Sequence, residues 1–398
     1  MKRNICFFLR VSLCSALLFF ATSAYSQVEV SLLTCQPHDE VYSLYGHTAI
    51  RVQNHKTGAD IAINYGFFDP TIDYFVPRFV FGLTDYSMGV CSYQYFLDEY
   101  HRYGSGVYEQ HINMSEEEKR DFLAALLENS RPENVVYRYN YFYNNCTTKA
   151  RDIILNAIPA EIEYTANKYQ QGERSFRQLV HLKTSLHPWA QWGNDLLLGF
   201  QADVDTEHDE REFLPEVLSS DFQTARIVYP DGREKALVDS AFWALQPGKA
   251  WQNPDNIDFP LTPLRMSWIF LFLVIAYCLF EFYVLMRTSR GAVVAQYIRY
   301  FFFCLYALVG IILFLMLFSQ HPTVRLNFQI FIFNPFFFFL ALPRVRKGRR
   351  IIFLSILMFF LGNLVQDYAE GVNVLAVAAL VLCIHIWKKE DGHISLSI

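Results

Sequence analysis

Residues 140–154 read NYFYNNCTTKARDII and place Cys146 where an aromatic run gives way to a helical pattern. The pattern ends at a proline, so the sequence predicts a helix from Cys146 to about Ile158, with Asn144 or Asn145 as its N-cap. Free N–H groups and the positive end of the helix dipole favour the thiolate, the nucleophilic form of cysteine. A small buried hydrophobe is the alternative, but two asparagines and two threonines around the cysteine make a poor apolar site.

A secretory signal peptide is predicted at the N-terminus. Residues 1–26 begin with basic side chains, continue as a short apolar stretch and end in Ala24-Tyr25-Ser26, a small-x-small cleavage site. An uncleaved anchor helix is the alternative. We expect the segment that follows to be exported, which places its cysteines in an oxidising compartment.

The cysteines of the exported part are odd in number. The chain has eight cysteines, and three of them, Cys35, Cys91 and Cys146, lie in this soluble part. An odd number leaves at least one thiol free or paired with another chain. We expect Cys35 and Cys91 either to pair with each other or to be buried, and Cys146 to stay a thiol.

Apolar residues are concentrated in the C-terminal part of the chain. They make up 53% of the 398 residues, and after Met266 they form five segments. The first two are long enough to span a bilayer, whereas the other three are shorter. The sequence therefore predicts an all-α membrane domain of about five transmembrane helices, at Met266–Met286, Tyr300–Phe318, Phe328–Leu342, Ile351–Val365 and Val374–Trp387.

Positive charges fall in alternate loops of this membrane domain. The loops between them, SQHPTVRLN and QDYAEGVN, are nearly free of positive charge. By the positive-inside rule, the soluble domain faces outward and the C-terminus faces the cytoplasm. The charged positions are Arg287, Arg290, Arg299, Arg344, Arg346, Lys347, Arg349, Arg350, Lys388 and Lys389.

These observations divide the chain into five parts. We expect a signal peptide at 1–26, a periplasmic catalytic domain at 27–250, a linker at 251–265, a transmembrane helical domain at 266–390 and a cytoplasmic tail at 391–398. The formal net charge is −5, and the soluble part has no cluster of lysines and arginines, so we expect no nucleic-acid partner.

The exported part alternates short strand-like and helix-like stretches, which indicates a mixed α+β domain. Ser115 and Glu118 form a capping-box pattern that opens a helix through Leu127. Residues 227–238 are predicted to be a hairpin around Pro-Asp-Gly. Runs rich in β-branched and aromatic residues predict strands at 28–35, 46–52, 60–66, 87–96 and 134–143.

A nucleophilic cysteine needs a base, and His47 is the best-placed histidine. It begins the alternating strand HTAIRV, so its side chain points to one face of a sheet, where a packed helix could present Cys146. A strand-edge histidine bonded to backbone is the alternative. A third group should orient the imidazole, and Asn64 on the next strand is the first candidate, with Asp60 and Asp69 behind it.

Other polar residues are candidates for binding the substrate or an ion. Arg51 and Arg78 could bind a lipid phosphate or be surface charges. Asp203 and Asp205 could hold a cation, although an exposed acidic loop is the simpler interpretation, and we predict no metal site. The residues that we assign to substrate binding are Arg51, Tyr65, Asn145, His321 and Asn327.

Two features of the membrane part also bear on function. The outer loop with His321, Arg325 and Asn327 could contact a phospholipid headgroup or merely cap two helices. Glu281 lies inside the first predicted span, where an ionisable side chain is either functional or reaches the interface by snorkelling. The run Phe336–Phe339 is predicted to face lipid.

The order of these residues, a histidine strand, a polar residue on the next strand and then Asn-Cys at a helix start, resembles the circularly permuted branch of the NlpC/P60 thiol superfamily. That branch includes the lecithin:retinol acyltransferase-like enzymes. The resemblance implies a permuted papain-like fold for the periplasmic domain. It also implies chemistry through a thioester, because several members of the branch move acyl groups from phospholipids.

A closer resemblance covers almost the whole chain. The segments LLTCQPHDEVYSLYGHTAIRV, INYGFFDP, YFYNNCTTKARDII, LLLGFQADVD, REFLPEVL and SQHPTVRLNFQIFIFNP are similar to the Lnb-type bacterial lipoprotein N-acyltransferases. The resemblance implies an enzyme of the bacterial inner membrane that needs no cofactor. It would acylate the α-amino group of a diacylated lipoprotein's N-terminal cysteine, with a phospholipid as donor. By matching motif, Cys146 would be the nucleophile and His47 the base.

Two other functions fit the same residues. A periplasmic thiol peptidase or amidase acting on cell wall or protein would use the same Cys-His pair, but it would have no particular use for the spans. A membrane scaffold without catalytic activity would keep its function when Cys146 is replaced.

Overall fold

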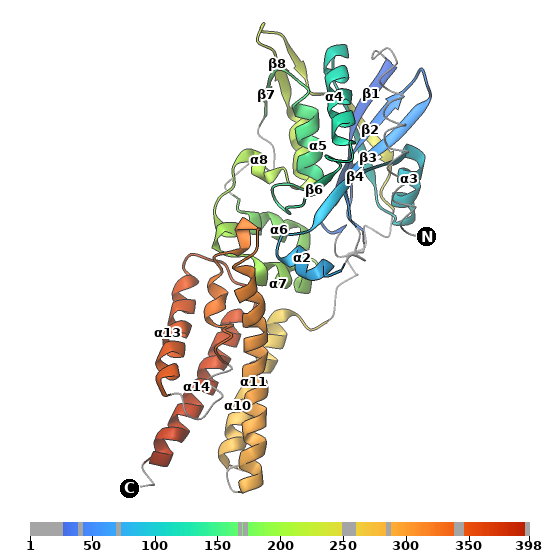
Figure 1. The fold of residues 1–398 in the computed structure, drawn as a ribbon. Coiled ribbons are helices and arrows are strands. Elements are labelled where there is room, and N and C mark those ends of the chain that lie inside the picture. Colours follow the sequence, from blue (N-terminus) through green and yellow to red (C-terminus); the bar gives the residue numbers. More distant parts are fainter. Residues whose placement is uncertain are drawn as a thin grey trace. The chain divides into compact units, whose positions relative to one another are not determined.

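The computed structural model describes residues 27–38, 43–68, 73–165, 169, 174–248, 260–283, 288–337 and 346–394. The expected signal peptide and most of the expected linker lie outside these residues. The chain forms two compact units (Figure 1). Unit 1 consists of Met1–Phe176 and Asp205–Asn256, and unit 2 consists of Arg177–Val204 and Ile257–Ile398. The inserted segment Arg177–Val204 lies within 27–250, the stretch that the sequence assigns to the exported domain.

Unit 1 is built on an antiparallel sheet of seven strands. Its spatial order is β10-β5-β1-β2-β3-β4-β6, so the strands that carry His47 and Asn64 lie in the middle of the sheet. A second sheet of three short strands, β7-β8-β9, lies apart from it. The strands are β1 (Val28–Cys35), β2 (His47–Asn54), β3 (Ala59–Phe67), β4 (Asp85–Ser92), β5 (Val107–Ile112), β6 (Val136–Arg138), β7 (Glu161–Glu163), β8 (Arg226–Val228), β9 (Glu234–Ala236) and β10 (Val238–Leu245).

Helices cover both faces of the main sheet (Figure 1). Alternate residues of β2 point to opposite faces, as the period of a strand requires. Ile50 and Val52 pack under α4 (Glu116–Asn129), α5 (Cys146–Leu155) and α9 (Pro215–Thr224). On the other face, Ala49 packs with residues of α3 (Tyr93–Arg102). The two faces thus bury separate apolar clusters, and each large side chain in them contributes about 1.5–3 kcal/mol.

The structure confirms the predicted α+β architecture of unit 1, and the permuted papain-like fold stays a prediction. The capping box at Ser115 and the hairpin around Asp231 are confirmed. Two predicted strands are wrong in part. Residues 87–96 leave the sheet at Ser92, because the Ser92 hydroxyl caps α3. Residues 134–143 contribute only the three-residue strand β6.

The predicted pairing of Cys35 with Cys91 is wrong, because both residues are free thiols. Cys35 ends β1 and Cys91 lies in β4, and two strands separate β1 from β4. Three strand spacings amount to roughly 14 Å, which is about twice the Cα separation that a disulfide tolerates. Cys35 is buried, as the alternative expectation had it, and Cys91 is half-buried.

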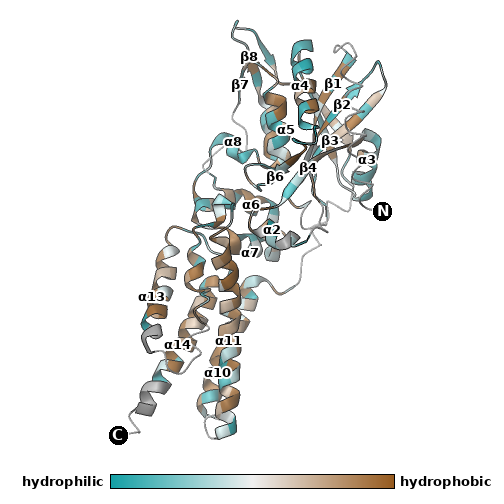
Figure 2. Cartoon of the chain, viewed as in Figure 1, coloured by the Kyte–Doolittle hydropathy of each residue, from teal (hydrophilic) through white to brown (hydrophobic). Residues whose placement is uncertain are grey.

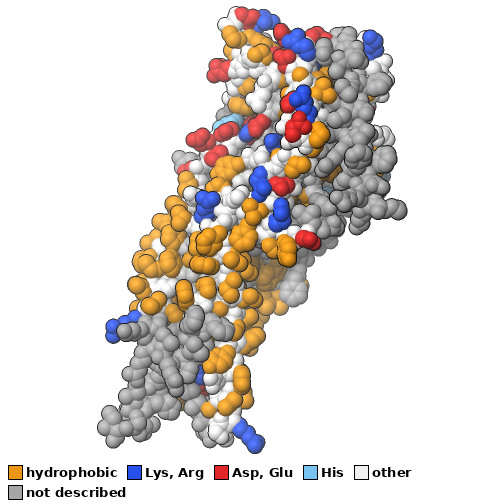
Figure 3. All heavy atoms as spheres, viewed as in Figure 1, with side chains coloured by type: hydrophobic (Ala, Val, Ile, Leu, Met, Phe, Trp, Pro, Cys, Tyr) orange, Lys and Arg blue, Asp and Glu red, His pale blue; other side chains and the backbone are white. Residues whose placement is uncertain are grey.

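Unit 2 is helical and apolar (Figure 2). Among the described residues, two helices are long and apolar enough to cross a membrane, α10 (Pro263–Tyr283) and α11 (Ser289–Met316). Shorter apolar stretches occur in α13 (Arg346–Gly362) and α14 (Val372–Ile394). Figure 3 shows hydrophobic side chains covering much of the surface of this unit.

The predicted number of five spans stays a prediction. The third predicted segment, Phe328–Leu342, begins as the short 3₁₀ helix η7 (Phe328–Phe331), and residues 338–345 lie outside the described part. Glu281 does not reach the interface by snorkelling, because it is almost fully buried. Its carboxylate accepts hydrogen bonds from Tyr277 of α10 at 2.6 Å and from His385 of α14 at 3.0 Å.

Buried polar contacts hold α7 (Pro188–Leu197), which lies in the inserted segment of unit 2, against the segment between α11 and α13. The Asn327 amide donates to the Leu196 carbonyl at 2.7 Å, and the Gln329 amide donates to the Asp195 carbonyl at 2.8 Å. The guanidinium of Arg177, which is 1% exposed, pairs with the Asp195 and Asp203 carboxylates. Asp203 is therefore committed to an ion pair.

Candidate active site

The N-terminus of α5 is fixed by Asn145, which is its N-cap as predicted. The Asn145 side-chain oxygen accepts hydrogen bonds from the backbone N–H groups of Thr147 and Thr148, both at 2.9 Å. The Thr148 hydroxyl oxygen accepts from the Asn145 N–H and completes a capping box. The Asn145 amide also donates to the carbonyls of Tyr141 and Phe213. Its hydrogen-bonding capacity is thus used inside the protein, where it holds Cys146 in the first helical turn.

Cys146, the first residue of α5, and His47, the first residue of β2, interact electrostatically across the helix and the sheet. The side-chain hydroxyls of Thr48 and Thr147, which follow these two residues in the chain, bond to each other at 3.1 Å and tie the strand to the helix start. Cys146 as a whole residue is half-buried. The structure therefore brings together the two residues that the sequence singled out.

The electrostatics of the pair favour a thiolate. Burial opposes ionisation of Cys146, but the positive charge and hydrogen bond of His47 outweigh it, and hydrogen bonds from the Thr48 backbone and the Thr147 hydroxyl add to them, so the pKa of Cys146 falls to about 7. Burial disfavours the imidazolium as well, yet the charge and hydrogen bond of Cys146 and the hydrogen bond with Asn64 raise the pKa of His47. An ion pair consequently begins to form near neutral pH.

Asn64, the first candidate for the third residue, is hydrogen-bonded to His47 and orients its ring. Its side-chain oxygen lies 3.0 Å from His47 Nε2, so Nδ1 is the ring nitrogen left for the thiol. The Asn64 amide lies 3.9 Å from Cys91 Sγ, which supports this orientation of the amide. Of the other two candidates, Asp60 is paired with Arg51, and Asp69 lies outside the described residues.

Glycine 66 lets the chain pass close to the pair, and sequence reasoning did not find this role. Its φ is +123°, in the region that side chains disfavour, and the pairing of β3 with β4 is irregular there. A Cβ at this position would lie 3.8 Å from Cys146 Cβ and 3.9 Å from His47 Cε1. Gly46, directly before His47, has φ +79°, and its Cβ would come within 2.7 Å of the Cys35 carbonyl oxygen.

A cavity of about 380 Å³ opens beside the pair on the face of the sheet that α3 covers. His47, Asn64 and Gly66 line its inner part together with Cys91. The predicted substrate-binding residue Tyr65 lines it too, although Tyr65 is buried in the opposite core. Aromatic residues of β3, of α3 and of the chain just after each also line it, namely Phe67, Phe68, Tyr95, Phe96, Tyr100 and Tyr103. The wall further includes Gln36, His38, Ser43, Gly46 and Glu99.

The remaining predicted substrate-binding residues serve other contacts. Arg51 pairs with Asp60 at 2.7 Å and with Glu109 at 2.9 Å, and its guanidinium stacks on Tyr93, so its charge is already balanced. His321 and Asn327 belong to unit 2, where Asn327 is buried and caps η7.

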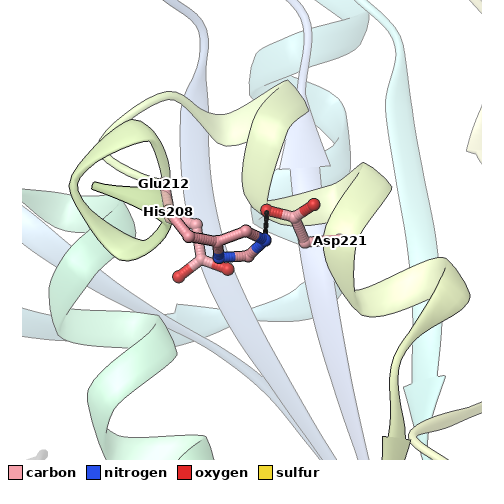
Figure 4. A group of neighbouring side chains, drawn as sticks. All are labelled: His208, Glu212 and Asp221. Atoms are coloured by element: carbon pink, nitrogen blue, oxygen red, sulfur yellow. Dashed lines mark ion pairs between the residues drawn. The ribbon is translucent and has the colours of Figure 1, made fainter. Parts of the chain in front are cut away.

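A second group of titratable side chains in unit 1 was not found from the sequence. The ligand atoms of His208, Glu212 and Asp221 all lie within 4.8 Å of one another (Figure 4). Arg151 donates to the Glu212 carboxylate at 3.1 Å and supplies a positive charge that a metal ion would otherwise bring. Burial, reinforced by Asp221, raises the pKa of Glu212 to about 8 against the lowering effect of Arg151. Glu212 therefore carries a proton at neutral pH.

Comparison with known proteins identifies the family. Residues 18–180 match the family model of the Lnb N-terminal periplasmic domain, and residues 254–390 match that of the Lnb transmembrane domain. No curated protein and no solved structure matches the chain. Together the two matches cover the candidate active site and the membrane helices in the order expected from the sequence. The chain therefore belongs to the Lnb family of membrane proteins with a periplasmic N-terminal domain, and this membership indicates an enzyme of lipoprotein maturation.

Proposed function

We propose that this protein is a lipoprotein N-acyltransferase that moves an acyl chain from a phospholipid, through a thioester on Cys146, to the α-amino group of a lipoprotein's N-terminal cysteine. The observation that carries the proposal is the chain of contacts from Cys146 to His47 to Asn64 at the start of a capped helix. This chain contains a nucleophile, a base and an orienting group in the order that covalent acyl transfer needs.

In the first half-reaction, His47 Nδ1 holds the proton of Cys146, and the thiolate attacks the ester carbonyl carbon of the phospholipid. The backbone N–H groups of Thr147 and Thr148 are already bonded to Asn145, so the Cys146 N–H is the donor of this turn that remains for the oxyanion. When the C–O bond breaks, the imidazolium of His47 returns the proton to the leaving alkoxide. A lysophospholipid leaves, and the acyl chain stays on sulfur.

The membrane unit accounts for the choice of an acyl-transfer reaction over peptide hydrolysis. Both the phospholipid donor and a diacylated lipoprotein reside in a bilayer, and α10 and α11 are long enough to reach across one. A single span already anchors a domain irreversibly, so the additional apolar helices α13 and α14 exceed what an anchor requires. We place the enzyme in the inner membrane, with unit 1 in the periplasm and the C-terminus in the cytoplasm.

The proposal is tested by mass spectrometry of a reporter lipoprotein's N-terminal peptide. The lipoprotein is produced in cells that lack any other N-acyltransferase and that carry this chain, its Cys146→Ala variant or its Cys304→Ala variant. Cys304 is the matched control, because it is an exposed free thiol on α11 of unit 2. We expect one extra acyl chain on the terminal amine with the wild type and with Cys304→Ala, and none with Cys146→Ala.

A diacylated peptide in all three strains, with the protein present in the membrane, would refute the transferase. Hydrolysis of cell-wall fragments by the wild type, lost in Cys146→Ala, would then establish a thiol amidase on the same pair. An extra acyl chain in all three strains would instead support the acyltransferase activity and show that this activity does not require Cys146.

A further inference from the structure

The cavity beside His47 contains one charged side chain that the first half-reaction does not use. Glu99 of α3 is half-buried and lines this cavity together with His47 and Asn64. Among the residues that line it, all of them within the described ranges, Glu99 is the only acid, and there is no lysine or arginine. The fixed charge of the cavity is therefore negative.

The Glu99 carboxylate has no partner within the described part of the chain: no hydrogen bond or ion pair joins it to another side chain there. The neighbouring acids differ. Glu109 accepts from Arg51 and Tyr93, and Asp98 accepts from Gln94. A half-buried carboxylate without a partner loses hydration that a cation could replace. Glu99 is the last and smallest of the groups that raise the pKa of His47, after Cys146 and Asn64, so its charge affects the reacting pair only weakly.

The charge of the cavity favours one of the two substrates, the amine of the acceptor or the phospholipid donor. Once Cys146 is acylated, His47 has lost its negative neighbour. With neutral imidazoles at His47 and at His38, the other histidine of the wall, the cavity carries the single negative charge of Glu99. Such a cavity attracts an ammonium group and repels a phosphate. Its mouth suits a cation that is joined to lipid, because Phe67, Phe68, Tyr95 and Tyr103 are 51%, 41%, 57% and 44% exposed and offer aromatic faces and apolar area.

We propose that the cavity between α3 and β3 binds a primary ammonium group, the α-amine of the acceptor, with the Glu99 carboxylate as its ion-pair partner. This proposal rests on the proposed function and adds the acceptor site to it. The geometry also matches the chemistry of transfer, because the incoming amine must come within reach of His47, and His47 and Glu99 line the same cavity.

The second half-reaction balances with these groups. The bound ammonium first loses one proton to water, and the free amine attacks the thioester carbonyl carbon. A C–N bond forms, the nitrogen gives its second proton to His47, and the C–S bond breaks with its electron pair on sulfur. The products are the amide and a Cys146 thiolate beside a His47 imidazolium, ready for the next phospholipid. Glu99 binds and orients the amine throughout and keeps its charge.

The experiment separates the two half-reactions in the full-length protein in phospholipid nanodiscs. Intact-mass measurement follows the acyl adduct on Cys146 after mixing with donor lipid, and then its decay when a diacylated lipopeptide with a free N-terminal amine is added. We compare the wild type, Glu99→Gln and the matched control Asp98→Asn, an exposed acid one residue away on the same helix that does not line the cavity.

We expect all three proteins to form the adduct at the same rate. In Glu99→Gln, the lipopeptide concentration for half-maximal decay should rise roughly 10- to 100-fold, which is the loss of one charge-assisted pair. Asp98→Asn should match the wild type. Decay that is equally sensitive to lipopeptide in Glu99→Gln and the wild type would overturn the acceptor site while leaving the transferase standing. Absence of any adduct in the wild type would instead refute the proposed function.

The headgroup of an ethanolamine phospholipid also carries a primary ammonium group and could bind at Glu99. Changing the headgroup of the donor lipid distinguishes this possibility from binding of the acceptor amine. Adduct formation is therefore measured with an ethanolamine lipid and with a glycerol lipid of the same acyl chains. We expect Glu99→Gln to leave both rates unchanged. Slower adduct formation from the ethanolamine lipid alone would overturn the assignment to the acceptor and assign Glu99 to the donor headgroup.

Discussion

Unit 1 contains two clusters that combine a histidine with neighbouring polar groups, and they are built in opposite ways. At Cys146 and His47 the environment stabilises the charged forms of both partners, and a cavity opens beside them. In the cluster of His208, Glu212 and Asp221 (Figure 4), burial stabilises the protonated form of Glu212. Arg151 donates a hydrogen bond to the same carboxylate. Proximity of titratable groups is therefore a weak sign of function. The direction in which their pKa values move, and access to a cavity, distinguish a reactive pair from a structural one.

The largest expected effect comes from removing the base. In His47→Ala, the thiol keeps its burial but loses its cation, so its pKa should rise from about 7 to above its usual value. Acyl-adduct formation at neutral pH should fall roughly 10³-fold. The pH profile of Cys146 alkylation checks the cause, because its midpoint should lie near pH 7 in the wild type and move upward in the variant.

His55→Ala is the control for this prediction, because His55 is an exposed histidine just beyond the same strand. It should leave both the rate and the midpoint unchanged. An alkylation midpoint in His47→Ala equal to that of the wild type would mean that His47 does not stabilise the thiolate, and the contrast between the two clusters would lose its basis.

Asn64 offers the next largest effect. Asn64→Ala removes the acceptor at His47 Nε2, so the ring can rotate and adopt the other tautomer. We expect adduct formation to slow by roughly 10- to 100-fold while the thiol remains in place. Gln53→Ala, at a half-buried position near the far end of β2, is the control. If Asn64→Ala reacted as fast as the control, the third position would belong to another group.

Much of this site could be predicted from local sequence. The alternation around His47 and the Asn-Cys step at a helix start both encode short-range geometry, and the structure confirms the strand, the helix and the N-cap. The role of Gly66 depends on a bulge between β3 and β4, a tertiary feature with no local signal. The ion pair of Arg51 was not predicted for the same reason, because its partner Glu109 is supplied by a strand 58 residues further along the chain. A role of Arg51 in substrate binding stays a prediction.

In the membrane half too, features that depend on local sequence were predicted, whereas contacts between residues far apart in the chain were not. Composition and length predicted α10 and α11, whose apolar surfaces meet lipid or one another. The docking of α7 on the segment between α11 and α13 was not predicted, because it depends on hydrogen bonds such as that from Asn327 to Leu196, 131 residues apart. An asparagine in a loop carries no sequence sign of whether it will bind a ligand or satisfy a buried carbonyl.

We expect the N-cap residue of α5, Asn145, to contribute more to the free energy of unfolding than an ordinary N-cap does. Replacing a capping residue by alanine typically costs about 1 kcal/mol, but Asn145→Ala would also leave the buried carbonyls of Tyr141 and Phe213 without donors. We expect a loss of roughly 2–3 kcal/mol, seen as a lower midpoint of thermal unfolding. Ser115→Ala, which removes the cap of α4, is the matched control and should cost about 1 kcal/mol. Equal losses in both variants would show that the extra contacts of Asn145 contribute nothing.

The smallest effect concerns the cluster of His208, Glu212 and Asp221 and is visible only in the dependence of stability on pH. Glu212 has a folded pKa of about 8, above its usual value of 4.5, so between these values the native state binds the proton more tightly than the unfolded chain does. Stability from this group is therefore complete below about pH 4.5 and is lost as the pH rises through 8.

Glu212→Gln mimics the protonated acid and should remove this loss, roughly 1–2 kcal/mol between pH 6 and pH 8. Hydrogen exchange of the amides of α9 at the two pH values, corrected for the intrinsic rate, measures it in the folded protein. Asp209→Asn, an exposed neighbour, should keep the pH dependence of the wild type. A pH dependence in Glu212→Gln as steep as in Asp209→Asn would show that Glu212 is already ionised, in which case Arg151 outweighs burial and the two clusters resemble each other more closely than their surroundings indicate.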